Sequence, residues 1–347
     1  MPAARDRFPK AHRPLVGGGS GEGKARPRRA VLAAALATAG CIHPTPTPPP
    51  GSAAVALPPL SLAGPLRSLG GLHIDNAALG AGGLSALHLD DALVATFIDD
   101  RTRWAQARLV LRDGLAAGLV PMAAGALNDG AGQPLPRGYA GDAEGLARLP
   151  DGTWLVSFER WHRIRAYRRL DGAGVYFEAP PGLRRAPTNG GLEALALLAD
   201  GRLLAITERL EPLGSPDLRE GWIGGPGQWS LLAYRPAEGF HPVDAAGLPD
   251  GGALVLERRF AWYSGFAARL VRVSAAAIAA AGQGAVLEGM EILRLDGGVA
   301  PAENWEGLAT LQHDGRLLVA IVSDDNHTLT QRSLLLLFDL EEGAPGS

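Results

Sequence analysis

The sequence predicts an all-β protein, a β-propeller of about six blades that follows an N-terminal signal segment and a proline-rich linker. Three observations lead to this prediction. A segment of about twenty residues recurs roughly every fifty residues, each copy holds two short apolar runs around a tight turn, and helical periodicity is nearly absent. Apolar residues form 46% of the 347 residues, which is enough for a large buried core.

Charge and cysteine content exclude several classes of protein. Residues 1–41 hold eight Lys and Arg against two acids, whereas the rest of the chain has 25 Arg, no Lys and 34 acids. An acidic domain repels a phosphate backbone, so we expect no nucleic-acid partner. The single cysteine excludes a disulfide framework and a cysteine-ligated zinc site. We expect a monomer.

Residues 1–41 have the pattern of a bacterial signal peptide. A basic stretch ending in paired arginines precedes the apolar run at 30–39, which is too short to span a bilayer. Thr38–Cys41 resembles a lipobox and predicts lipidation of Cys41, whereas Ala37–Ala39 fits ordinary signal-peptidase cleavage, and both alternatives stay open. We expect an exported lipoprotein of the periplasm or outer membrane, which contacts a membrane only through its lipid.

A proline-rich stretch follows this segment and favours polyproline II, a semi-rigid spacer. The predicted organisation is a signal peptide at 1–41, a linker at 42–62, a propeller domain at 63–342 and a tail at 343–347. Within the domain, the best helical pattern is the short run Ser274–Ala281.

The repeated segments have the form of β-hairpins. They span 82–101, 142–160, 190–209, 242–259 and 304–326. Four of them turn at Asp-Gly and the first at Asp-Asp, and Asp-Gly between apolar runs is a strong hairpin pattern because tight turns need positive φ. Each interval leaves room for two further strands, as in a propeller blade. A sixth blade is predicted from 66–75 and 331–340, closing the ring; a β-sandwich is the alternative fold.

Acidic residues recur at the open ends of these hairpins. Glu144 and Glu159 flank one turn at seven and eight residues, and Glu193 and Glu208 repeat these offsets in the next copy. Antiparallel pairing brings the members of each pair together, and propeller symmetry gathers the pairs around one mouth of the central channel. The remaining copies supply Glu306, Asp324, Asp325, Asp99 and Glu257.

Carboxylates held this close repel one another unless a cation lies between them. One candidate is the set of arginines that follow the acids, which would form salt bridges between blades: Arg101, Arg160, Arg209 and Arg258. The other is a hard divalent cation, most plausibly Ca²⁺, which takes about six to eight oxygen ligands. Both interpretations stay open.

Other catalytic patterns are weak. No G-x-S-x-G motif supports Ser85 or Ser264 as a nucleophile. His162 follows a hairpin end and is a candidate base or phosphate ligand, with an ordinary loop histidine as the alternative.

Several stretches together resemble a known family. GLSAL, DAEGLA, SFERWHRI, NGGLEALALLADGRLLAITE and NWEGLA with DGRLLVAIVSDDN are similar to the bacterial phytase-like β-propeller family, described as "esterase-like activity of phytase". The likeness extends over roughly residues 66–340. It implies an exported propeller related to calcium-dependent phytases, which cleave phosphomonoesters with metal-activated water. The domain has no Lys, which argues against phytate itself as substrate.

The resemblance also implies roles for individual residues. The acids that would bind Ca²⁺ are Asp142, Glu159, Glu208, Glu306, Asp324 and Asp325. The residues that would take part in catalysis are Glu144, Glu193 and Arg160, with Arg163 as a further basic residue of the motif. His162, the candidate base or phosphate ligand named above, is added to this catalytic set. The arginines would hold a small anionic ester or phosphoester and stabilise charge that develops on it.

Three functions therefore remain open, and the sequence does not decide whether the protein is an enzyme. The first is a metal-dependent hydrolase of phosphate or carboxylic esters that uses the carboxylate-lined mouth. The second is a non-catalytic cell-envelope propeller that binds or scaffolds a partner. The third is a lactonase-like hydrolase that acts on a cyclic ester at the same mouth.

Overall fold

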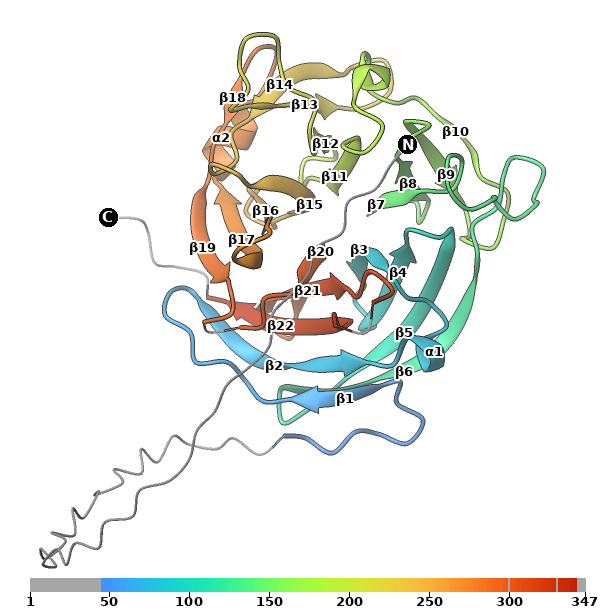
Figure 1. Ribbon diagram of the computed structural model, residues 1–347, viewed down its shortest axis with the longest axis vertical. Coiled ribbons are helices and arrows are strands. Elements are labelled where there is room, and N and C mark those ends of the chain that lie inside the picture. The colour runs from blue at the N-terminus through green and yellow to red at the C-terminus, as the bar shows by residue number, and fades with distance from the viewer. Residues whose placement is uncertain (1–44, 299, 329, 342–347) are drawn as a thin grey trace, which may run out of the picture. The chain divides into compact units, whose positions relative to one another are not determined.

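Five β-sheets, antiparallel except for one edge strand, stand in a ring around a central channel in the computed structural model (Figure 1). The structure describes residues 45–298, 300–328 and 330–341. This arrangement is a β-propeller, so the predicted fold class is confirmed. The predicted signal peptide and Cys41 lie outside the described residues.

Four blades are formed mainly by strands that follow one another in the chain. The first blade consists of β3 (Leu84–Leu89), β4 (Val94–Asp99), β5 (Arg103–Arg112) and β6 (Leu115–Ala126). The second consists of β7 (Ala143–Arg148), β8 (Trp154–Phe158), β9 (Arg163–Tyr167) and β10 (Val175–Phe177). The third consists of β11 (Leu192–Leu197), β12 (Leu203–Thr207), β13 (Arg219–Gly224), β14 (Ser230–Tyr234) and a parallel edge strand, β18 (Val286–Leu287). The fourth consists of β15 (His241–Gly247), β16 (Ala253–Ala261), β17 (Gly265–Val273) and β19 (Met290–Leu295).

The fifth blade joins the two ends of the described chain. Its strands, from the channel outward, are β20 (Asn304–His313), β21 (Arg316–Asp324), β22 (Leu334–Leu340), β2 (Leu66–Ile74) and β1 (Ala54–Leu57). The predicted pairing of the first and last strands is present, but β22 also pairs with β21. The expected sixth blade is therefore the outer part of the fifth, and the count of about six blades is corrected to five.

Few elements lie outside the sheets. In the part of the chain that the structure describes, the helices are α1 (Asn76–Leu79), α2 (Ala275–Ala280) and the 3₁₀ turn η1 (Leu183–Arg185). The predicted helix near 274–281 is thus present as α2, and the Ser274 hydroxyl caps it by accepting the Ala277 N–H at 3.2 Å. Among the described residues, no helix is long and apolar enough to cross a membrane.

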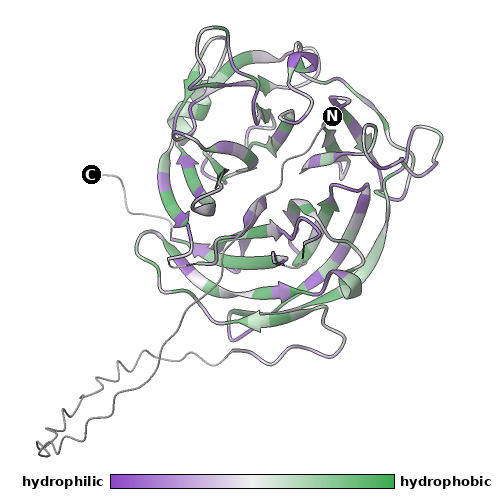
Figure 2. Ribbon diagram, viewed as in Figure 1, coloured by the Kyte–Doolittle hydropathy of each residue, from purple (hydrophilic) through white to green (hydrophobic). Residues whose placement is uncertain are grey.

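Apolar side chains fill the spaces between neighbouring blades. Figure 2 shows the strands coloured mainly as apolar and many of the loops as polar. One cluster joins Ala86 and Ile98 of the first blade to Leu146 and Phe158 of the second. The innermost strands β3, β7, β11, β15 and β20 each contact their neighbours in the ring. Burial between blades therefore fixes how the innermost strands stand around the channel.

Removal of a large side chain from the closing strand should destabilise the whole ring. Phe338 is fully buried on β22, which pairs with both β2 and β21. We expect Phe338→Ala to lower the free energy of unfolding by about 3–5 kcal/mol, measured by urea denaturation. The half-exposed Met122 gives the control, because Met122→Ala should change it by less than about 0.5 kcal/mol. Equal effects of the two variants would contradict this role of β22.

Candidate functional site

One β-bulge interrupts each innermost strand near its start. The residues that lack a partner in the ladder there include Ser85, Glu144, Glu193, Val243 and Glu306. An extra residue in one strand turns its side chain out of the regular alternation. The bulges therefore form a ring of equivalent positions at one mouth of the channel, and three of the five positions carry Glu.

A second ring of residues lies on the strands that pair with the innermost strands, opposite the bulges. The residues paired just before the bulges are Asp99, Phe158, Thr207, Glu257 and Ser323, and the next residues along are Asp100, Glu159, Glu208, Arg258 and Asp324. Neighbouring residues on a strand point to opposite sides, so these two sets have different surroundings. Asp99 accepts the N–H groups of Arg101 and Arg103, and Glu257 accepts the Tyr234 hydroxyl. The sequence predicts Asp99 and Glu257 at the mouth, but the next residues along the strands, Asp100 and Arg258, occupy these positions.

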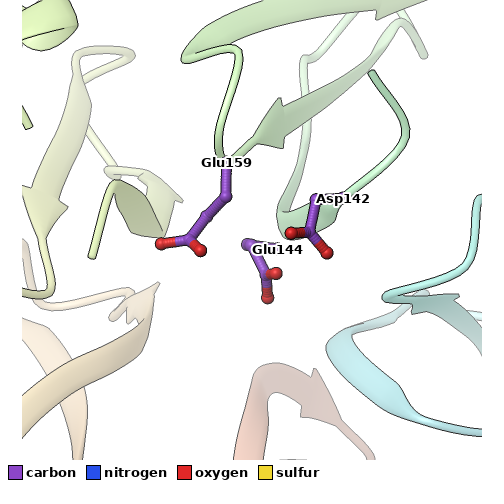
Figure 3. Close-up of side chains that lie close together, drawn as sticks. All are labelled: Asp142, Glu144 and Glu159. Atoms are coloured by element: carbon purple, nitrogen blue, oxygen red, sulfur yellow. The ribbon is translucent and has the colours of Figure 1, made fainter. Parts of the chain in front are cut away.

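Five carboxylates of this mouth form two overlapping sets. Oxygen atoms of Asp142, Glu144 and Glu159 all lie within 4.8 Å of one another, and Figure 3 shows these side chains close together. Oxygen atoms of Glu159, Glu193 and Glu208 lie equally close. Glu159 belongs to both sets. The predicted meeting of the hairpin acids is therefore present, and it extends across two neighbouring blades.

The backbone after β10 fixes Glu159. Its Oε1 accepts the N–H groups of Gly190 and Gly191 at 2.5 and 2.6 Å. His162 Nε2 lies 3.2 and 3.0 Å from the carbonyl oxygens of Ala186 and Pro187 in the same loop. A Cβ on Gly191 would stand 2.5 Å from His162 Nδ1, so this position has no room for a side chain. His162 therefore holds the loop that holds Glu159.

Arginines neutralise part of the mouth. Arg258 forms ion pairs with Glu306 and Glu208 and donates to the Asn304 side chain at 2.6 Å. Arg160 and Arg209 pair with Asp142 and Glu208 at 2.5 and 2.9 Å. Burial alone would lower the pKa of Arg258, but the carboxylates, Glu306 foremost, raise it, so this guanidinium stays charged. The salt-bridge interpretation thus applies to these acids.

Glu144 and Glu193 differ from the other acids of the mouth. Neither forms a hydrogen bond or an ion pair within the described part of the chain, and Glu193 is 7% exposed. Burial first, and then the neighbouring carboxylates, raises the pKa of both groups well above its usual range. Buried carboxylates without a partner are costly to a fold. The negative charge of the mouth that has no partner among the described residues is therefore concentrated at these two carboxylates.

Burial also raises the pKa values of the other acids of the mouth. Burial raises the pKa of Glu159 to about 7, although the two backbone N–H groups oppose the rise. It raises the pKa of Glu306 to about 8 against the effect of Arg258, and that of Asp324 to about 6. The Asp142 pKa is also raised, chiefly by burial.

The donor set fits a hard divalent cation. Every side-chain ligand on offer is a carboxylate oxygen, and Ca²⁺ prefers such ligands. A cation bound between these groups would remove the repulsion that raises their pKa values. The residues positioned to hold it are Asp142, Glu144, Glu159, Glu193 and Glu208.

Several predicted site residues lie outside the two sets. Glu306 and Asp324 share the mouth but bind Arg258 and the Asn304 amide. Asp325 accepts the Gly83 N–H and the Asn76 amide, which ties the loop after β21 to the first blade. Arg163 stacks on Phe158 and Trp161 and donates to backbone carbonyls. These contacts give Asp325 and Arg163 roles in holding loops.

Comparison with known proteins finds one matching family and several similar solved structures. The family described as "Phytase-like: Esterase-like activity of phytase" matches residues 80–327. No curated protein sequence matches the chain. Among solved structures, the PQQ-bound aldose sugar dehydrogenase of Streptomyces coelicolor has a TM-score of 0.43 at 14% identity, covering 80% of this chain and 99% of that one. The gluconolactonase XC5397 of Xanthomonas campestris has a TM-score of 0.41 at 12% identity, covering 84% and 99%. Likeness of this size gives no basis for transferring an activity.

The raised pKa values predict a pH-dependent stability. Glu159 and Glu306, with pKa values raised to about 7 and about 8, keep part of their protons in the folded protein above pH 6.5, whereas the unfolded chain has lost them. The free energy of unfolding in chelator should therefore fall from pH 6.5 to 8, by up to about 1.4 kcal/mol per pH unit for each group. Urea denaturation at several pH values measures this slope.

A substitution tests whether the acids of the mouth cause this pH dependence of the free energy of unfolding. Glu193→Gln should reduce it, whereas Glu238→Gln, at an exposed position, should leave it unchanged. His88 and His241, whose pKa values burial lowers, act in the opposite sense, because the unfolded chain binds protons at these groups more readily than the folded protein does. Stability that stays flat or rises between pH 6.5 and 8 would contradict the assignment.

Proposed function

Because the chain belongs to the phytase-like family, we propose that it is a metal-dependent hydrolase of phosphate or carboxylic esters, with Ca²⁺ as its metal. The family match, residues 80–327, covers most of the chain. One observation of the structure supports the proposal most directly. Glu144 and Glu193 are carboxylates without partners in the described part of the chain, and each lies in a set of carboxylates with the spacing of metal ligands.

The proposed ligands divide between two neighbouring positions. Asp142 and Glu144 serve one position, Glu193 and Glu208 serve the other, and Glu159 lies between them. A divalent cation bound there would polarise the ester and lower the pKa of a water molecule beside it. Asp142 and Glu208 also pair with arginines, so metal binding would share these two acids with Arg160 and Arg209.

Backbone N–H groups and arginines of the protein would position the metal ligands and the substrate. The two backbone N–H groups hold Glu159 Oε1, whereas its second oxygen, Oε2, accepts no hydrogen bond among the described residues. Arg258 stays charged and keeps a fixed positive group within the mouth. Arg160, whose side chain is 40% exposed at the rim, is placed to contact an anionic substrate that approaches the mouth. A preorganised charge of this kind stabilises charge that develops on the substrate.

The other two functions differ from this one in measurable ways. The arginine pairs at Glu208 and Glu306 favour the non-catalytic propeller, because they neutralise part of the mouth without a metal. Stable binding of a partner without turnover would support it. A lactonase-like hydrolase would use the same acids on a cyclic ester, and a panel of linear esters, phosphoesters and lactones separates these activities.

The metal is tested first by thermal unfolding. Protein of residues 42–347, stripped with chelator and titrated with Ca²⁺, should show a saturable rise of Tm. A ligand that binds only the folded state stabilises it by about 2.7 kcal/mol at a hundredfold excess over Kd. Glu144→Gln should abolish the rise, and Glu238→Gln should retain it. No rise with any divalent cation would overturn the metal proposal.

Catalysis is tested separately on esters and phosphoesters. Glu193→Gln and Glu159→Gln should lower kcat/KM by at least about 10- to 100-fold at saturating Ca²⁺, because each removes a proposed ligand. Metal binding with unchanged activity in both variants would show that hydrolysis takes place elsewhere.

We also propose that the protein is exported and lipidated at Cys41. Mass spectrometry of the membrane fraction should find an N-terminal diacylated cysteine, and Cys41→Ser should release the protein from that fraction. A free N-terminus at Gly40 would favour ordinary signal-peptidase cleavage instead.

A further inference from the structure

A cavity of about 350 Å³ lies between the first and fifth blades, beside the acidic mouth. Three arginines line it: Arg101 and Arg103, around the turn into β5, and Arg137, in the connection from β6 to β7. We call it the arginine pocket. Asn76, Asp99, Asp325 and His327 also line it.

The acids of the arginine pocket are already engaged by other groups. Asp99 accepts the backbone N–H groups of Arg101 and Arg103 at 2.9 and 2.7 Å. Asp325 accepts the Asn76 amide at 2.9 Å and the Gly83 N–H at 3.2 Å. These bonds hold the carboxylates in the walls of the pocket.

The guanidinium groups, in contrast, retain free donors. Arg103 donates through Nε to the Gly80 carbonyl at 2.9 Å and forms no ion pair within the described residues. Arg137 is exposed and likewise has no carboxylate partner in that part of the chain, and Arg101 reaches Asp100 only at 3.8 Å. Guanidinium groups bind carboxylate and phosphate with paired, charge-assisted hydrogen bonds. The chemistry of the arginine pocket is therefore that of an anion site.

The arginine pocket borders the acidic mouth. His327 Nε2 lies 3.3 Å from Asp100 Oδ1, and Asp100 belongs to the second ring of the mouth. On the other side, Gly138 follows Arg137 directly, and a Cβ there would lie 3.9 Å from Arg160 Nη1. The arginine pocket thus adjoins Asp100 and Arg160, and Arg160 pairs with Asp142 of the mouth.

We propose that the arginine pocket binds a carboxylate or phosphate group of the substrate while its scissile ester lies at the acidic mouth. The inference rests on the proposed hydrolase for the identity of the ligand, but the anion site itself does not. The substrate is then an ester with a second group, anionic and separate from the bond that is cleaved. An uncharged ester would lack this contact.

The anion site is tested without metal or turnover. Isothermal titration of the full mature chain in chelator, with inorganic phosphate and with acetate, should show one saturable site, and the stronger binder identifies the preferred group. Arg137→Ala should weaken binding about tenfold or more, the loss expected for a charge-assisted hydrogen bond. Arg168→Ala is the matched control, because Arg168 is exposed, forms no ion pair among the described residues and contributes nothing to the pocket.

Two results of this titration would overturn the anion site. One is the absence of saturable binding of either anion. The other is an equal loss in Arg137→Ala and Arg168→Ala, which would mean that anions bind by general charge. Circular dichroism and Tm of Arg137→Ala confirm that the variant is folded, and Arg101→Ala provides an independent second variant.

The link to the substrate is tested with a matched pair of esters, an aryl acetate and the corresponding aryl hemisuccinate. In Arg137→Ala, KM for the hemisuccinate should rise about tenfold with kcat unchanged, and KM for the acetate should not move. An equal rise for both esters would overturn the substrate assignment. If the protein hydrolyses neither ester nor any phosphoester, the hydrolase proposal fails, whereas the titration still decides the anion site.

Discussion

An extra residue in each innermost strand is the constraint on which the acidic mouth depends. In a regular ladder, successive side chains alternate between the two faces of a blade, and both faces are covered by neighbouring blades. The bulge breaks this alternation and turns Glu144 and Glu193 toward other carboxylates. Gly145 makes this possible in the second blade, because a Cβ there would lie 2.4 Å from the Glu193 carbonyl oxygen. The bulge with Gly145 thus allows both the close packing of the second and third blades and the crowding of their acids.

The charges of the acidic mouth are only partly balanced. Arg258 stands in the fourth blade where the second and third blades carry Glu159 and Glu208, and it neutralises the side of the ring nearest Glu306. On the second and third blades, Arg160 and Arg209 pair with Asp142 and Glu208, but Glu144 and Glu193 have no guanidinium partner among the described residues. Buried acids without partners reduce stability, and proteins retain such groups where function requires them. The carboxylates without partners thus lie on the second and third blades, and the proposed metal site lies there with them.

The two ends of the channel use acidic residues differently. At the far end, the Asp-Gly turns place an aspartate where it accepts a backbone N–H two residues later, as Asp151 does from Thr153 and Asp200 from Arg202. These repeated acids stabilise turns. At the mouth, the arginine pocket and the carboxylate sets adjoin across Asp100 and Arg160. Opposite charges arranged side by side suit a ligand with two chemically different parts.

The sequence alone determined the hairpins, the propeller class and the pairing of Glu144 and Glu193 with later acids, because turn chemistry and spacing are local. It did not determine the blade number, since β22 pairs on both sides and only ring closure decides where it lies. It also misplaced Asp99 and Glu257 by one residue, because a bulge shifts register and a one-residue shift reverses the direction of a side chain. The arginine pocket depends on segments that only the tertiary structure brings together, so no spacing in the chain indicated it.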